Sequence, residues 1–187
     1  MTDTQLLSAV GVTIDGITLK DVAAMSIEEL MAIPGIGRKR AERLKAAFEI
    51  GFRYAVDRPL PEHAIRGPQD VVDALGPRMR ALEVEEFHVL LLSNSGRILE
   101  DVTVSKGILN ASLVHPREVF KQAIKRSAAS VILMHNHPSG VLEASREDHG
   151  ITKQLVEGGK LLDIHVQDHI IICGDTYLSF AENGWMD

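Results

Sequence analysis

"SVILMHNHPSGVLEASRED", residues 130–148, decides the fold of the larger part of the chain, because it joins a buried strand to two histidines. Residues 131–134 are wholly apolar, as expected for a central strand covered on both faces. His135 and His137 follow at i and i+2, so in an extended chain their rings project from the same face. Pro138 then turns the chain away. The stretch predicts two imidazoles at the carboxyl end of a buried strand, where open α/β sheets commonly carry their sites.

Ser145 and Asp148, at the end of this stretch, have two interpretations. A Ser-x-x-Asp spacing ahead of a helical pattern is typical of a helix N-cap. The same geometry exposes the Asp148 carboxylate on the first helical turn, beside the end of the strand. Two neutral imidazoles and one carboxylate leave a fourth tetrahedral position open, as a catalytic zinc ion requires. The two interpretations are compatible, because a capping residue can also face a metal.

Strand and helix patterns alternate on both sides of this stretch. The turn "NSGR" separates two strand patterns, and Pro116 is well placed to open a helix. The pair Gly76-Pro77 is expected to break the helix that contains it. Helices that alternate with a mixed sheet indicate an α/β or α+β domain. We expect strands at 86–93, 98–105, 130–134, 165–173 and 176–180, and helices at 69–82, 116–128 and 146–159.

A proline-rich segment, residues 57–68, divides the chain. Pro59, Pro61 and Pro68 prevent a continuous helix across it, and Gly67 adds a turn. We therefore predict a small helical domain at 1–56, a linker at 57–68 and a larger domain at 69–187.

The small domain contains "IPGIGRKRAERL", residues 33–44, in which Gly35 and Gly37 allow a tight turn and close approach of the backbone. The N–H groups and the dipole at the start of the next helix favour an anion. The pattern resembles the helix-hairpin-helix motif, which would contact DNA phosphates without reading sequence. A helical scaffold or a protein-docking segment is the alternative. Three basic residues accompany the glycines: Arg38, Lys39 and Arg40.

Composition limits the classes of protein that are possible. The net charge of −6 argues against a protein that coats nucleic acid, although residues 38–58 carry seven Lys or Arg against three Asp or Glu. The single cysteine, Cys173, excludes an internal disulfide and the zinc deaminase signature. No apolar run approaches the roughly 20 residues of a membrane helix, and the N-terminus lacks a basic signal region. We expect a cytoplasmic protein with no membrane contact.

The spacing His-x-His-Pro, six residues, Ser-x-x-Asp matches the JAMM motif of JAB/MPN metalloproteases. The flanking "GILNASLVHPREVFKQAIKRSAASVILMHNHPSG" and "LLDIHVQDHIII" resemble the RadC family, in which a helix-hairpin-helix segment precedes a JAMM domain. The resemblance covers about residues 20–187. It implies a three-layer JAB/MPN-like domain with Zn²⁺ held by His135, His137 and Asp148, and water as the fourth ligand. It also implies that Ser145 hydrogen-bonds the carbonyl oxygen of the substrate.

The resemblance further implies a glutamate that activates the water, at the start of the first strand of the domain. Here "VEEFHVLLLS" offers Glu85 and Glu86, which project to opposite faces. The E-x-F pattern usual in RadC-like sequences selects Glu85, ahead of Phe87. Glu86, and Glu100 in the next strand, remain alternatives.

Three other polar residues lie near the predicted site. Asp168 and His169, in or before a closing strand, either support a metal ligand by a hydrogen bond or have a structural role. Asn136, between the two histidines on the opposite strand face, is expected to make local hydrogen bonds.

Three functions are compatible with the sequence. The first, which the family resemblance favours, is a zinc metallopeptidase acting on a peptide or isopeptide-linked protein substrate. The second is a DNA-binding accessory protein of DNA repair whose zinc domain is structural. The third is a zinc phosphodiesterase that cleaves nucleic acid. No part of the sequence indicates the substrate's identity or an oligomeric state.

Overall fold

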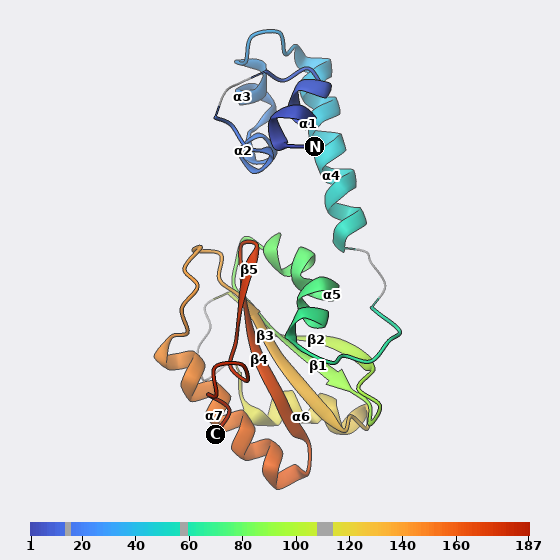
Figure 1. The fold of residues 1–187 in the computed structure, drawn as a ribbon, viewed down its shortest axis with the longest axis vertical. Helices are drawn as coiled ribbons and strands as arrows, with labels where there is room; N and C mark the ends of the chain where they lie inside the picture. Colours follow the sequence, from blue (N-terminus) through green and yellow to red (C-terminus); the bar gives the residue numbers. More distant parts are fainter. Residues whose placement is uncertain (14–15, 57–59, 108–113) are drawn as a thin grey trace. The chain divides into compact units, whose positions relative to one another are not determined.

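The computed structural model describes residues 1–13, 16–56, 60–107 and 114–187. The chain divides into two compact units, Met1–Asp57 and Arg58–Asp187 (Figure 1). The larger unit is built on one five-stranded sheet of order β2-β1-β3-β4-β5, in which β3 and β4 are parallel and the other pairs are antiparallel. Its strands are β1 (Glu86–Leu92), β2 (Ile98–Lys106), β3 (Ser130–Asn136), β4 (His165–Cys173) and β5 (Thr176–Ser179).

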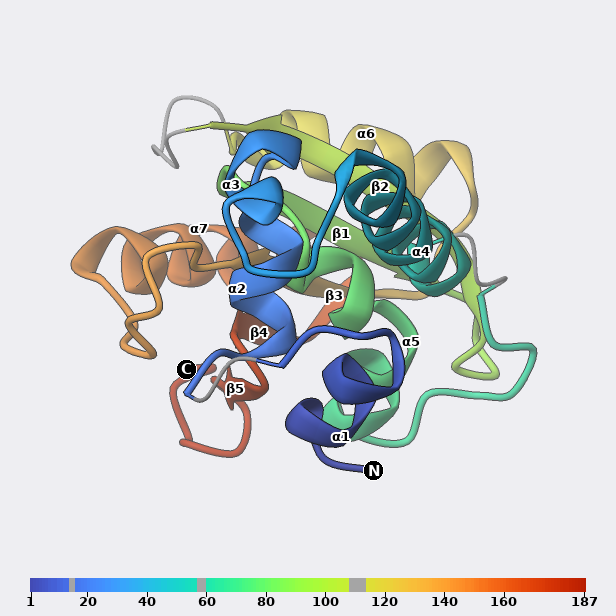
Figure 2. The ribbon, with the colours of Figure 1, turned by 90° about the horizontal axis from the view of Figure 1, so that it is seen from above.

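Three layers make up the larger unit, as the α/β (α+β) prediction required. Helix α5 (Pro68–Arg80) covers one face of the sheet, and α6 (Pro116–Lys125) and α7 (Arg146–Leu162) cover the other (Figures 1 and 2). The central strand β3 serves both faces and is buried along its whole length. Ile132 packs on the α5 side and Leu133 on the α6–α7 side, as the two-residue period of a strand dictates.

The predicted break at Gly76-Pro77 is wrong, because α5 continues through both residues. Proline removes one helical hydrogen bond. Val72 and Leu75 before the pair and Met79 after it are all buried against the sheet. Burial on both sides of the proline holds the helix together, since each buried aliphatic side chain contributes roughly 1.5–3 kcal/mol.

The predicted linker is also shorter than expected. Its residues 57–59 lie outside the described residues. Leu60 and Ile65 pack against the core beneath α5, and the Ile65 N–H donates to the carbonyl of Gly96 at 2.8 Å. The segment from residue 60 onward is therefore part of the larger unit, since its apolar side chains are covered by that core.

The smaller unit is all helical. Its core consists of one buried cluster, to which all four helices contribute a residue, among them Leu7, Val22, Leu30 and Leu44. Capping boxes open the first three helices, and Ser26 and Glu29 form the third of them. The helices are α1 (Asp3–Ala9), α2 (Leu19–Ala24), α3 (Ile27–Met31) and α4 (Arg38–Val56). No helix among the described residues is long and apolar enough to cross a membrane.

We expect Gly159→Ala to destabilise the larger unit by roughly 1–3 kcal/mol or more. A Cβ at Gly159 would clash with the Ile164 carbonyl oxygen and lie 3.2 Å from the Phe120 ring, and the backbone atom cannot move aside. Urea unfolding followed by the fluorescence of Trp185, the only tryptophan, measures the effect.

Gly150→Ala on the same helix is the matched control. A Cβ there would meet nothing within 4 Å, so helix propensity should raise the free energy of unfolding by about 1 kcal/mol. Equal stability of the two variants would contradict the close packing at Gly159.

Candidate metal centre

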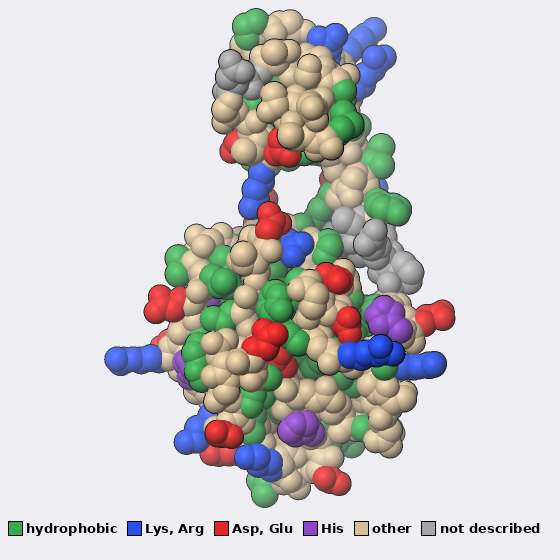
Figure 3. Space-filling view, viewed as in Figure 1, with side chains coloured by type: hydrophobic (Ala, Val, Ile, Leu, Met, Phe, Trp, Pro, Cys, Tyr) green, Lys and Arg blue, Asp and Glu red, His purple; other side chains and the backbone are tan. Residues whose placement is uncertain are grey.

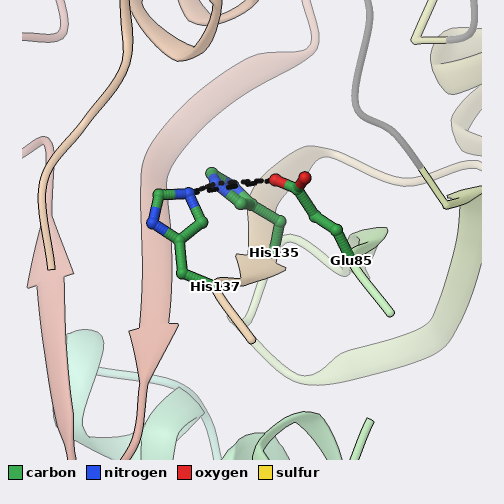
Figure 4. Close-up of side chains that lie close together, drawn as sticks. All are labelled: Glu85, His135 and His137. Carbon is green, nitrogen blue, oxygen red and sulfur yellow. Dashed lines mark hydrogen bonds and ion pairs between the residues drawn. The ribbon is translucent and has the colours of Figure 1, made fainter. Parts of the chain in front are cut away.

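The end of β3 and the start of β1 bring three predicted site residues together. His135 and His137 leave β3 on the same face, and their Nε2 atoms lie 2.9 Å apart. The Oε1 atom of Glu85, the residue before β1, lies 3.8 Å from each of these nitrogens. Figure 4 shows the three side chains pointing toward one another, and their ligand atoms lie within 4.8 Å of each other.

Asp148 adds a second carboxylate from the first turn of α7. Its Oδ1 atom is 3.3 Å from His135 Nε2, and its Oδ2 atom is 3.9 Å from His137 Nε2. The side chain is almost fully buried. Asp148 also completes a capping box with Ser145, so it caps the helix and faces the histidines at the same time.

A hydrogen bond from the ring orients His137. Its Nδ1 atom is 2.9 Å from the carbonyl oxygen of Val141. A carbonyl only accepts, so Nδ1 carries the proton and the Nε2 lone pair faces the cluster. The loop after Pro138 thereby selects the tautomer that a metal ligand needs.

A longer chain of hydrogen bonds orients His135. The Thr152 hydroxyl donates to the Asp148 carbonyl at 2.6 Å, so it accepts from Nδ1 of His169, also at 2.6 Å. Because the proton of a neutral His169 is on Nδ1, its Nε2 atom has none and accepts a hydrogen bond from Nδ1 of His135 at 2.8 Å. The Nε2 lone pair of His135 is then directed at the cluster.

Burial keeps these two imidazoles neutral. It lowers the pKa of His135 to about 4, even though the Asp148 carboxylate acts in the opposite direction. Burial likewise holds the pKa of His169 well below its ordinary value. Phe87 lies against both rings, with centroids 6.0 Å from His135 and 5.5 Å from His169. His135 therefore offers a neutral nitrogen at physiological pH, the protonation state in which histidine binds a metal.

The other candidate glutamates are engaged elsewhere. Glu86 is 5% exposed and pairs with Lys106 at 3.1 Å and with His88 at 3.2 Å. Burial alone would raise the pKa of Glu86, but its hydrogen bonds with Lys106 and His88 lower it. Glu100 pairs with Arg126, whose hydrogen bond lowers the pKa of that carboxyl. Of the three glutamates, the structure places only Glu85 beside the histidines.

A cavity of about 610 Å³ opens over the cluster, between the start of β1, the loop after β3 and the start of α7. Glu85, His137, Ser145 and Asp148 all line it. The Ser145 hydroxyl donates to Asp148 Oδ2 at 2.7 Å and accepts from the Asp148 N–H at 3.1 Å. Ser145 is thus in the cavity wall, but its proton is directed at Asp148, so a hydrogen bond to a substrate carbonyl requires that proton to turn.

The donor set fits a zinc ion. Two imidazole nitrogens and carboxylate oxygens are ligands that zinc accepts. Ligands at zinc distances lie roughly 3.3 Å apart in a tetrahedron, close to the 2.9 and 3.3 Å that separate His135 Nε2 from His137 and Asp148.

The predicted DNA-contacting residues lie at the start of α4 in the smaller unit. Gly35 adopts a φ of +85°, as the turn requires. Arg40 donates to the Gly35 carbonyl at 2.9 Å, and a Cβ at Gly11 would lie 3.2 Å from its guanidinium. Arg40 therefore ties the turn to the α1–α2 connection, a structural role that the sequence did not indicate. Arg38 pairs with Glu42 at 3.1 Å on the exposed surface.

Gly37 and Lys39 complete this set. A Cβ at Gly37 would meet nothing within 4 Å, so the backbone there is open to close approach. Lys39 is exposed, and it forms no ion pair within the described residues. Figure 3 shows Lys and Arg side chains gathered at the top of the smaller unit.

The layered sheet and the residues at the ends of β1 and β3 define a JAB-fold protein with an N-terminal helix-hairpin-helix unit. A family model described as a RadC-like JAB domain matches residues 65–185, and a SAM-like helix-hairpin-helix tandem matches residues 4–49. The chain belongs to the RadC-like family. The tandem match corresponds to two helix pairs, α1–α2 and α3–α4, of which the sequence predicted only the second.

Relatives that are longer than this chain support this assignment. The chain is 46% identical to a UPF0758 protein of Clostridioides difficile (strain 630), over 88% of this chain and 70% of that protein. It is 44% identical to a UPF0758 protein of Methanosarcina mazei, over 90% and 73% of the two chains. A UPF0758 protein of Caldanaerobacter subterraneus subsp. tengcongensis is 46% identical, over 90% and 72%.

Sequence reasoning left one contribution to the site undecided and missed another. The bond from His169 to His135 was one of two alternatives, and the role of Thr152 was not foreseen. The signal was weak, because these residues lie 34 and 17 positions from their partners on other elements. Asn136 was expected to bond locally, whereas both of its bonds reach residues about 50 positions away.

Proposed function

We propose that the protein is a zinc-dependent hydrolase that cleaves a peptide or isopeptide bond. The observation that carries this proposal is the convergence of His135, His137, Asp148 and Glu85 beside an open cavity that all of them except the buried His135 line. A metal held by two imidazoles and one buried carboxylate keeps a position free for water, the arrangement of catalytic rather than structural zinc.

Each residue has a defined task in the proposed reaction. Bound zinc would supply Lewis-acid polarisation of the scissile carbonyl and a more acidic water. His135, His137 and Asp148 would hold it. Glu85, with its side chain 26% exposed, takes a proton from the attacking water and delivers it to the leaving amine. Ser145 donates a hydrogen bond to the carbonyl oxygen, where negative charge develops.

Metal analysis of the purified protein, combined with cleavage of peptide and isopeptide libraries, tests this proposal. We expect one zinc per chain, hydrolysis that a chelator abolishes, and recovery when zinc is restored. Wild-type protein without stoichiometric zinc would contradict the proposal. Metal-dependent cleavage of labelled DNA or RNA, with peptides left intact, would replace it by a phosphodiesterase function.

Contact with DNA phosphates is a second candidate function, carried by the smaller unit. The N-terminus of the long helix α4 and the exposed Lys39 present an anion-binding surface. We expect DNA binding that is independent of sequence and weakens as salt rises. Lys39→Ala should reduce the slope of log affinity against log salt by about 1.

Arg40→Ala is the informative comparison, because Arg40 is held by the Gly35 carbonyl. This variant should lower the thermal stability of the smaller unit and change the salt slope less than Lys39→Ala does. The phosphate-binding function would be contradicted if the wild type, Lys39→Ala and Arg40→Ala bound DNA with the same affinity, or if the affinity did not depend on salt.

A further inference from the structure

We propose that Asn136 is a positioning residue for Glu85, and that it acts by holding the two peptide groups that flank this glutamate. The inference rests on the proposed role of Glu85 as the proton carrier. It concerns the residue between the two histidines, whose side chain takes no part in the metal cluster. Asn136 is buried, with only 2% of its surface exposed.

The side chain of Asn136 forms two hydrogen bonds with the strand that carries Glu85. Its Oδ1 atom accepts the Glu86 N–H at 2.8 Å. Its Nδ2 atom donates to the Val84 carbonyl at 3.0 Å. One side-chain amide thereby bonds to the backbone on both sides of Glu85, with its oxygen as acceptor and its nitrogen as donor. Both partners lie about 50 positions from Asn136 in the sequence.

The main chain of β3 does not provide these bonds. The ladder between β1 and β3 ends with Phe87 opposite His135. Beyond that pair, the N–H of His137 donates to Ile172 of β4 at 2.8 Å, and Pro138 has no N–H to donate. The backbone pairing of β1 with β3 ends at Phe87, and the Asn136 side chain provides the next hydrogen bonds to this strand.

A third hydrogen bond, which does not involve Asn136, completes the clamp. The Glu85 carbonyl accepts the Gly107 N–H at 2.8 Å, from the end of β2. The side chain of Glu86 is fixed on the opposite face by Lys106 and His88. The backbone of Glu85 is thus held although it precedes the first residue of β1, and its side chain is directed toward the histidines.

This arrangement links the base to the metal ligands through three consecutive residues. His135 and His137 supply the nitrogens, and Asn136 between them sets the strand that supplies the carboxylate. The distance between ligands and base is therefore governed by one short segment. Positional errors of about 1 Å can lower catalytic rates by roughly a hundredfold, so such a link has a clear catalytic value.

Amide hydrogen exchange in the metal-free full chain tests the proposal without a substrate. We expect Asn136→Ala to raise exchange at Glu86 by about tenfold, the equivalent of one hydrogen bond. Exchange at Gly107 should also rise, although Asn136 does not touch it, because the Glu85 carbonyl is no longer held in place. Zinc affinity, measured by competition with a chelating dye, should remain that of the wild type.

Two further variants make the result decisive. Asn94→Ala, in the exposed turn between β1 and β2, should leave all of these amides unchanged. Asn136→Asp keeps the acceptor and loses the donor, so it should protect Glu86 better than Asn136→Ala does, and it decides the matter if the alanine variant does not fold.

Unchanged exchange at Glu86 and Gly107 would overturn the proposal. A uniform rise along β1 and β3 would also overturn it, because Asn136 would then only stabilise the sheet. If zinc affinity fell while amide exchange at Glu86 and Gly107 stayed unchanged, Asn136 would act on the histidines instead of on Glu85. Absence of zinc from the wild type would sink the proposed hydrolase function, whereas the exchange pattern would still decide whether the clamp exists.

Discussion

Glu85→Gln is expected to lower the rate of peptide hydrolysis by roughly 10²–10⁴-fold, while zinc remains bound at one ion per chain. Glutamine has nearly the same shape but accepts no proton at neutral pH. The Glu85 carboxylate lies 3.8 Å from both histidine nitrogens, whereas that of Asp148 lies 3.3 Å from His135 and 3.9 Å from His137. Turnover and metal content, measured on the same preparation, check the prediction.

Glu86→Gln is the matched control, one residue along the same strand. Its carboxylate contacts Lys106 and His88, so the change should lower stability and leave hydrolysis within a small factor of the wild type. Loss of activity in Glu86→Gln together with full activity in Glu85→Gln would show that the wrong glutamate has been assigned. Loss of zinc in Glu85→Gln would show that Glu85 is a ligand instead of a base.

His135→Ala is expected to abolish stoichiometric zinc binding, and hydrolysis with it. His135 is completely buried and lies closest to the other proposed ligands, 2.9 Å from His137 and 3.3 Å from Asp148. Removing one of three ligands leaves too few to hold the ion against a chelator. Metal analysis after dialysis measures the loss, and retention of one zinc per chain would contradict the proposed ligand set.

A graded version of this experiment uses the hydrogen-bond chain behind His135. His169→Leu removes the acceptor that orients the ring, and should weaken zinc binding by roughly 10–100-fold without removing a ligand. Thr152→Ser keeps the hydroxyl and should retain wild-type affinity, whereas Thr152→Val should reproduce part of the loss. Equal affinity in all four proteins would mean that the chain does not support the metal site.

Local patterns in the sequence were sufficient for most of the fold. The apolar run of β3, the Ser26 and Ser145 capping boxes and the proline that opens α6 depend only on neighbours within a few residues. The errors arose where distant packing overrides such patterns. Pro77 does not interrupt α5, because helix residues before and after the proline are buried against the sheet. Leu60 and Ile65 join the larger unit because a core is available to cover them.

The choice between Glu85 and Glu86 shows what the sequence by itself determines and what it does not. Alternation along a strand determined that Glu85 shares a face with Phe87 and that Glu86 points the other way. Only the tertiary structure decided which face is the one with the histidines, by pairing Phe87 with His135 across β1 and β3. Side-chain direction follows from a two-residue period within one strand, whereas register depends on residues about 50 positions apart. The sequence determined the chemical groups, and the register of two strands decided which of them meet.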